Sequence, residues 1–266
     1  MKMTIFAVAA TVAAAITTAG CQSASCCCKK GCAKMTNQEF YDGGTFDANG
    51  INKGGKFNSA KAEKAYFDMF RKFGYPVFPA FTGEVKPNDG HGFWAVDFAK
   101  GDFVKYGMGG VIWVNEIREE YFGHDIYLLP GQSIAEHPHM PTHIKTKDEW
   151  TGKVFEKDLP CKMESWLVRH GGVWGFTTEG EPNLDKVPEA KARLSALLFD
   201  KDPKTGKQFL NCVHVEKWTA DGVAHKLAKD ESWHFMMGGD EGAIVSEFAN
   251  FHDSTCNRYT VPDVGF

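Results

Sequence analysis

The sequence carries no excess of basic residues and few cysteines beyond its first 32 positions. Its 30 Lys and Arg against 34 Asp and Glu give a formal net charge of −4. A nucleic-acid partner is not expected, because such partners select clustered positive charge. Three of the eight cysteines lie further on, at Cys161, Cys212 and Cys256. We expect these three cysteines to be buried and to pack as small apolar side chains rather than to form a disulfide framework. A single disulfide between two of them remains an alternative.

Internal repeats and the Gly-rich Rossmann and P-loop signatures are also missing. The hydrophobic fraction of 43% and the charged fraction of 24% are ordinary for a globular protein. Aromatic residues are plentiful at 13%, with 21 Phe and 7 Trp. They suit a β-rich core or a pocket lined with rings, and we favour the core.

Residues 1–21 have the pattern of an export signal. Lys2 precedes an apolar run from Thr4 to Ile16, which is too short to span a bilayer. The small residues that end in Ala19-Gly20-Cys21 resemble a bacterial lipoprotein box, although Thr18 departs from the usual Leu. We expect an exported protein, periplasmic or at the cell surface, with Cys21 as the lipidated residue. The alternative is ordinary cleavage and a soluble secreted protein.

Residues 22–57 are expected to be a Cys-rich tether and an irregular lead-in, and residues 58–266 a single domain. Asn58 and Ser59 can cap a helix from Ala60 to about Phe73, which Gly74 would end.

From Phe93 onward the pattern changes to short strands separated by Gly turns, which favours an all-β closed antiparallel barrel or jelly roll. Residues 141–160 are polar and predict a long loop or a short hairpin. A short inserted helix is predicted from Glu189 to Phe199, with Pro188 in its first turn. Strands are predicted at 94–98, 103–107, 109–117, 125–131, as two strands within 163–180, and at 209–218, 223–228, 232–237 and 242–251.

Three histidines and one glutamate stand out as candidate metal ligands. His137 and His139 are two residues apart, so both side chains would lie on the same face of a strand. A carboxylate on a neighbouring strand, Glu164, and a later imidazole, His234, can meet them inside a barrel. Other residues could serve as ligands instead. Glu149 is an alternative to Glu164, His225 is an alternative to His234, and His143 could also substitute as a ligand.

The spacing Gly131-x5-His137-x-His139, followed by Glu164-x6-Gly171, resembles the first motif of the cupin superfamily, with a longer gap before the glutamate. Within the cupins, the stretches DFAKGDFVKYGMGGVIWVNE, LLPGQSIAEHPH, KMESWLVRHGG and SEFANFHDSTCNRYTVPD resemble the D-lyxose isomerase family of sugar ketol-isomerases. The likeness spans Phe93 to Asp263. His252 and Cys256 replace an Asn and an Asp of the family's final strand.

The resemblance implies a cupin barrel that holds one divalent metal on His137, His139, Glu164 and His234. Mn²⁺ is the favoured ion, with Zn²⁺, Fe²⁺ or Co²⁺ left open. It also implies aldose–ketose isomerisation through an enediolate. Glu247 would be the acid/base carboxylate or an orienting residue, and Lys162 the active-site lysine or a solvated one. As substrate contacts we single out Trp166, His143 and Arg258.

Two other classes of function stay open. The first is a metal-dependent cupin oxygenase, because three His and one Glu also hold Fe²⁺ or Mn²⁺ in such proteins. The second is a carbohydrate-binding surface protein without turnover, which export favours. The expected partner is a small sugar, with the membrane reached only through a lipid anchor and a homodimer left open.

Overall fold

Strands make up most of the secondary structure in this computed structural model, which describes residues 34–86, 92–147 and 152–266. Residues 35–266 form one compact unit. The described chain has one helix of 15 residues, α1 (Ser59–Phe73). Its other helical segments hold three or four residues each: η1 Asn37–Glu39, η2 Leu184–Lys186, α2 Pro188–Lys191, η3 Ala196–Phe199 and η4 Ser254–Cys256. The predicted mostly-β architecture with few helices is confirmed.

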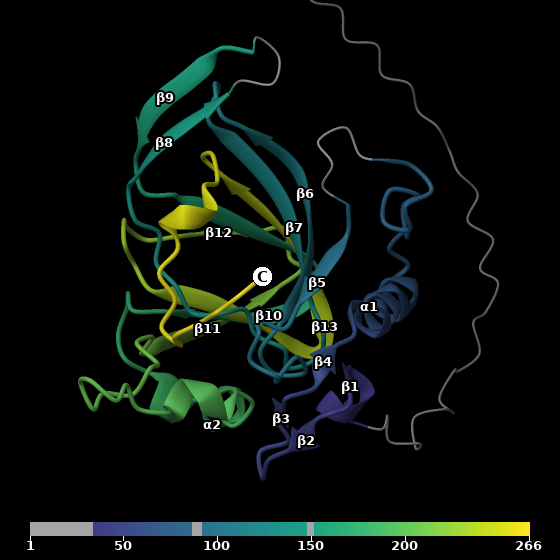
Figure 1. Ribbon diagram of the computed structural model, residues 1–266. Helices are drawn as coiled ribbons and strands as arrows, with labels where there is room; N and C mark the ends of the chain where they lie inside the picture. Colours follow the sequence, from purple (N-terminus) through teal and green to yellow (C-terminus); the bar gives the residue numbers. More distant parts are fainter. Residues whose placement is uncertain (1–33, 87–91, 148–151) are drawn as a thin grey trace, which may run out of the picture. The chain divides into compact units, whose positions relative to one another are not determined.

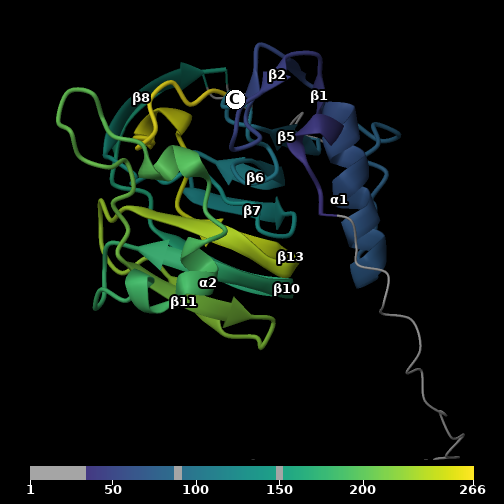
Figure 2. The ribbon, with the colours of Figure 1, turned by 90° about the horizontal axis from the view of Figure 1, so that it is seen from below.

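Seven antiparallel strands form the main sheet, in the order β11-β10-β13-β7-β6-β5, with β12 also paired to β10. Figure 2 shows β6, β7, β13, β10 and β11 following one another in this order. The bounds of the strands are β5 Trp94–Val96, β6 Met108–Glu116, β7 Tyr121–Leu128, β10 Glu164–Thr177, β11 His214–Thr219, β12 Ala224–Lys226 and β13 His234–Ala249.

The segment after β7 curls over the interior of this sheet without forming a regular ladder. Isolated bridges tie Ser133 to Tyr106 and Met237, His137 to His234, and His139 to Asn257. Within the described ranges, no hydrogen-bonded ladder joins β11 to β5, so closure of the predicted barrel is not observed. What is observed is a curved antiparallel sheet with one segment bridged across its inner side (Figure 1).

β10 and β13 are each one long strand where the sequence predicts two. The sequence predicts a turn at Gly171-Gly172 in the first and a break between Met237 and Gly242 in the second, and Gly171 and Gly242 do have positive φ, of 71° and 82°. These residues form a bulge in the β10–β13 ladder instead of ending it, with register shifts at Val168/His170 and Gly171/Val173. A Cβ on Gly171 would lie 2.0 Å from the carbonyl oxygen of Gly242, so this close approach of two backbones needs glycine.

Helix α1 covers the outer side of the sheet and confirms the predicted helix. Asn58 caps it by accepting a hydrogen bond from the backbone N–H of Lys61, and Gly74 ends it in the left-handed conformation. Its buried face packs aromatic rings onto the sheet, with the centroids of Phe70 and Tyr127 at 4.6 Å. The Tyr66 hydroxyl donates to Oε1 of Gln132 at 2.6 Å. This contact fixes the start of the segment that carries His137.

Two predicted elements are wrong, and one buried residue, Asp102, takes part in both replacements, through its backbone carbonyl in the first and its carboxylate in the second. Residues 103–107 form a turn instead of a strand, because the N–H groups of Lys105 and Tyr106 donate to the Asp102 carbonyl. The helix predicted over 189–199 is broken into α2 and η3. Ser195 adopts an extended conformation between them and its hydroxyl donates to Oδ2 of Asp102 at 2.6 Å. A tertiary hydrogen bond here outweighs local helix propensity.

The insert between His139 and Glu164 is a hairpin, which was one of the two predicted alternatives, the other being a long loop. It pairs β8 (Thr142–Lys147) with β9 (Val154–Leu159), the two strands at the upper left of Figure 1. The lead-in holds two smaller pairs, β1 (Tyr41–Asp42) with β4 (Lys56–Phe57) and β2 (Thr45–Phe46) with β3 (Asn52–Lys53). In the part of the chain that is described, no helix has the length and apolarity to cross a bilayer.

Candidate metal centre

Backbone pairing brings His137 beside His234. The N–H of each residue donates to the carbonyl oxygen of the other at 3.1 Å. His139 bridges to Asn257 in the same way that His137 bridges to His234, through an isolated antiparallel contact. One imidazole nitrogen from each of His137, His139 and His234 lies within 4.8 Å of the other two. The structure therefore brings together the three predicted imidazoles from segments far apart in the sequence.

The hydrogen bonds of the three rings fix which nitrogen faces the centre. Nδ1 of His137 donates to the Ala135 carbonyl oxygen at 2.7 Å, and Nδ1 of His234 donates to the Ser232 carbonyl oxygen at 2.8 Å. A backbone carbonyl only accepts, so both rings carry a proton on Nδ1, and Nε2 is the nitrogen left to face the centre. Nδ1 of His139 is likewise engaged, by Oδ1 of Asn257 at 2.7 Å. Such outer partners are typical of imidazoles that bind metals.

The carboxylate of Glu164 completes the group. Its Oε1 lies 2.9 Å from Nε2 of His139 and its Oε2 lies 3.1 Å from Nε2 of His234. Burial alone would raise the pKa of Glu164, but Lys162 and His139 hold it well below its usual value. Burial and the two neighbouring imidazoles lower the pKa of His137. An ionised carboxylate thus lies among the inward nitrogens of the rings, an arrangement that a cation among them would satisfy.

Lys162 links this group to a second carboxylate. Its Nζ lies 2.6 Å from Oε1 of Glu164 and 2.5 Å from Oε1 of Glu247, and 4.3 Å from the ring centroid of Phe122. Burial would lower the pKa of Lys162, but the two carboxylates raise it above its usual value, so the group is an ammonium ion. Oε2 of Glu247 lies 3.9 Å from Nδ1 of His124 and makes no closer bond to a described residue.

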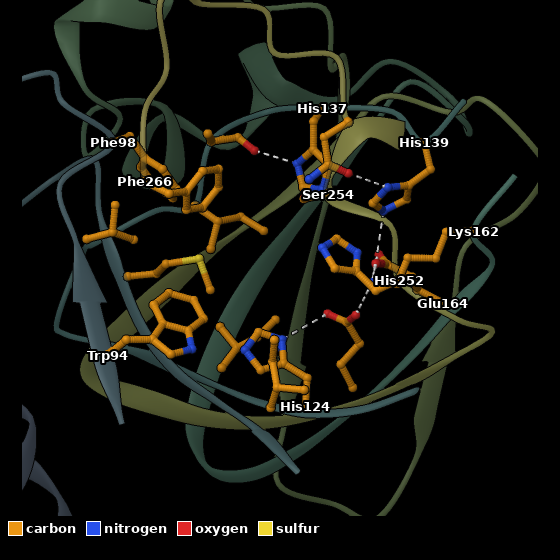
Figure 3. Close-up of a pocket in the computed structure, with 18 of the residues that line it drawn as sticks. Trp94, Phe98, His124, His137, His139, Lys162, Glu164, His252, Ser254 and Phe266 are labelled. Atoms are coloured by element: carbon orange, nitrogen blue, oxygen red, sulfur yellow. Dashed lines mark hydrogen bonds and ion pairs between the residues drawn. The ribbon is translucent and has the colours of Figure 1, made fainter. Parts of the chain in front are cut away.

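All of these groups except His234 line a cavity of about 350 Å³ (Figure 3), and His234 lines the neighbouring pocket. Glu247 reaches it from β13 and His124 from the adjacent β7, where the two residues are cross-strand partners. Trp94 stacks on His124, with ring centroids 5.6 Å apart. The imidazole of His252 projects into the cavity, and its Nδ1 is buried without a partner.

The three side chains predicted as substrate contacts do not line this cavity. Trp166 lies behind His234, stacked on Trp218 in a neighbouring pocket. His143 is exposed on β8, where it pairs with Asp158 and Glu156 of the facing strand. The Arg258 side chain turns away to donate to the carbonyl oxygens of Thr255 and Asn257.

The rivals and the cysteines have clear outcomes. His225 lies outside the histidine group and stacks on Trp218, with ring centroids 4.4 Å apart. Glu149 and Cys21 lie outside the described residues, and so does the whole predicted export signal. Cys161, Cys212 and Cys256 are free thiols and buried, as predicted.

Sequence reasoning missed His124, His252 and Tyr259 as cavity residues. The period-two alternation along β7 places His124 and Ile126 on one face, which was a usable signal, but its pairing with β13 was not readable. His252 was visible only as a departure from the family pattern.

Comparisons with known proteins agree with the resemblance. No family model matches the chain. A D-lyxose/D-mannose isomerase of Thermosediminibacter oceani is 27% identical over 180 residues, which cover 68% of this chain and 82% of that protein. A D-lyxose ketol-isomerase of Cohnella laeviribosi is 27% identical over 197 residues, covering 74% and 87%. The chain is distantly homologous to D-lyxose isomerases.

Solved structures give remoter likenesses. An L-ribose isomerase of Cellulomonas parahominis aligns with a TM-score of 0.44 and 11% identity, over 77% of this chain and 92% of its own. An oxalate decarboxylase of Bacillus subtilis aligns with a TM-score of 0.32 and 11% identity, over 57% of this chain and 28% of its own.

Proposed function

We propose that this protein is a metal-dependent aldose–ketose isomerase. The observation that carries the proposal is the convergence of three inward-facing imidazoles and the Glu164 carboxylate, with the Lys162–Glu247 pair at its edge. The distant homology to D-lyxose isomerases supports the same reaction class.

Four residues would hold the ion: His137, His139, Glu164 and His234. Mixed imidazole and carboxylate donors suit Mn²⁺, Fe²⁺, Co²⁺ or Zn²⁺, and the family resemblance favours Mn²⁺. When bound, a divalent ion supplies Lewis acidity toward the two oxygens of the reacting carbons. The hydrogen bonds from Nδ1 of His137 and His234 to backbone carbonyls hold these rings in place without further rearrangement.

Glu247 is the candidate base. Isomerisation moves a proton between C1 and C2 of the sugar, so the base must reach both carbons from one side. Oε1 of Glu247 is occupied by Lys162, which leaves Oε2 to accept and return the proton. Such a positioned carboxylate typically contributes about 10² to 10⁴ in rate.

Lys162 places a cation between two buried carboxylates, those of Glu247 and Glu164. The Lys162 ammonium bridges them at 2.5 and 2.6 Å. It can also stabilise negative charge that develops on a substrate oxygen.

We further propose that the protein is exported and held at the membrane through Cys21. The support is the sequence pattern of residues 1–21 alone. Mass spectrometry of the mature protein from its own cells tests it: a diacylglyceryl group on Cys21 is expected, and an unmodified mature terminus contradicts it.

The experiment that tests the isomerase proposal starts from chelated protein reloaded with Mn²⁺, incubated with pentoses and hexoses in D₂O. We expect aldose–ketose conversion, followed by NMR, only in the reloaded sample. Oxygen consumption without conversion would instead favour the oxygenase class, and sugar binding without any turnover would favour a binding protein.

A further inference from the structure

The cavity beside the candidate metal centre has two chemically different sides. Figure 3 shows His137, His139, Lys162, Glu164 and His252 on one side and Phe98 and Phe266 on the other. Val96, Met108, Ile126 and Ile134 add aliphatic surface to the second side, and Trp94 adds an indole ring. Tyr259 packs against Phe266, and its hydroxyl accepts a hydrogen bond from Nδ2 of Asn257. All four of these aliphatic residues are less than 9% exposed, so they form a buried wall of the cavity.

Strand register orders these residues by their distance from Glu247. Glu247 pairs with His124, and Ile126 follows two residues along β7, on the same face. Ile126 pairs with Gly110 of β6, which in turn pairs with Trp94 of β5. Two residues along a strand span about 7 Å. The row of Ile126 and Trp94 therefore lies roughly one hexose length from the candidate base.

The next row is wholly apolar. Val96 and Met108 are cross-strand partners and lie two residues further from Glu247 than the row of Ile126 and Trp94. Of these four side chains only Trp94 carries a hydrogen-bonding group, its indole N–H, and that ring is stacked on His124. A sugar with C1 and C2 beside Glu247 would place its far carbon among these side chains. A hydroxyl there would be desolvated with few partners, which is costly, whereas a methyl group would be buried favourably.

Building on the proposed isomerase function, we propose that the preferred substrate is an aldose without a hydroxyl group at its far end, a 6-deoxyhexose. The polar side of the cavity holds the oxygens near the reacting carbons, and the apolar side holds the C6 methyl group. His252, with a buried and unpartnered Nδ1 on the polar side, is placed to bond a hydroxyl of the middle carbons.

Matched sugar pairs test the proposal in the Mn²⁺-loaded protein. Each hexose, for example mannose, galactose and glucose, is compared with its own 6-deoxy form. For whichever stereochemistry is converted, we expect kcat/KM to be about 10- to 100-fold higher for the deoxy sugar. Equal values, or a preference for the 6-hydroxyl sugar, overturn the proposal. Conversion of neither member of any pair counts against the isomerase function itself.

A binding measurement distinguishes failure of the deoxy-sugar proposal from failure of the isomerase proposal. Sugar alcohols lack the carbonyl group and do not isomerise, so calorimetry with 6-deoxymannitol against mannitol, repeated for the other pairs, reports the apolar side alone. We expect Kd to be at least about tenfold lower for the deoxy alcohol. Equal Kd values in every pair overturn the proposal even where isomerisation is observed.

Two matched variants test whether the apolar wall of the cavity causes the preference for the deoxy sugar. Val96→Thr adds one hydroxyl to the apolar wall at nearly constant volume and is expected to reduce the deoxy preference several-fold. Val111→Thr makes the same change on the opposite face of β6, in the cluster under α1, and should leave the preference unchanged. An unchanged preference in Val96→Thr, with both variants folded, contradicts the assignment of the wall.

Discussion

His137 and His234 donate backbone hydrogen bonds to each other at 3.1 Å, and their imidazoles lie with ring centroids 4.8 Å apart. The same two bonds thus attach the segment after β7 to β13 and bring together two of the three histidines. A ligand that joins these rings would also fasten the segment of residues 131–140 to β13.

Metal removal is therefore expected to lower stability as well as activity. An ion at 100 times its Kd adds about 2.7 kcal/mol to the free energy of unfolding when it binds only the folded state. Chelation should lower Tm, and Mn²⁺ should restore it. His137→Ala should show a Tm that no longer responds to the metal. A wild-type Tm that is indifferent to chelation and reloading would argue against a metal at this site.

Removing the charge of Lys162 should be costly. Lys162→Met leaves Glu164 and Glu247 buried without their cation, and breaking a buried pair in this way costs about 3 to 5 kcal/mol. Denaturant unfolding measures the loss. The double variant Lys162→Met with Glu247→Gln should recover part of it. Lys64→Met, which removes a highly exposed partner of Asp68, serves as the control and should change stability little. Equal losses in the two single variants would contradict this account.

Gly110→Ala tests the support under Glu247. A Cβ at this position would lie 2.5 Å from Nε2 of His124 and 2.6 Å from Cζ2 of Trp94, so both rings must shift. Displacements of this size near a reacting group cost up to about 10²-fold, and we expect kcat/KM to fall by tenfold to a hundredfold. Gly123→Ala meets only Val114, at 3.2 Å, and is the matched control in the adjacent strand. Unchanged turnover in Gly110→Ala would remove His124 from the site.

The buried carboxyl of Asp102 is expected to make the stability of the fold depend on pH. Burial raises the pKa of this carboxyl above its usual value although Ser195 and Asn37 both donate to it. Because its pKa is raised in the folded state, the Asp102 carboxyl contributes fully to the free energy of unfolding below about pH 4. This contribution is lost as the pH rises through the folded-state pKa. Asp102→Asn removes this titration. The unfolding free energy of the variant relative to wild type should rise between pH 4 and 7, and a flat difference would contradict the prediction.

The residues of the proposed metal centre were predictable because each carries a local signal. His137 and His139 are separated by the period of a strand, and Glu164 and His234 occupy positions that the family pattern marks. For His124 the local alternation gave only its face of β7, because its place beside Glu247 depends on the register of β7 against β13, two strands separated by more than a hundred residues. Cross-strand partners at that distance are not encoded in local periodicity.

The errors in the fold have the same origin. The helix predicted over residues 189–199 fails where the Ser195 hydroxyl bonds Asp102, a residue some ninety positions earlier. The strands of β10 and β13 were divided at their glycine pairs, since a bulge and a turn use the same residues. Trp166 was placed in the cavity from its spacing to Glu164, and its packing on Trp218 moved it behind the histidine group.

The most direct test of the central claim is metal content and turnover measured together in Glu247→Gln. If Glu247 moves the proton while His137, His139, Glu164 and His234 hold the ion, the variant should retain the wild-type metal content. Its kcat for aldose–ketose conversion should fall by about 10² to 10⁴. Normal turnover with normal metal content would contradict the account, and so would loss of the metal in this variant.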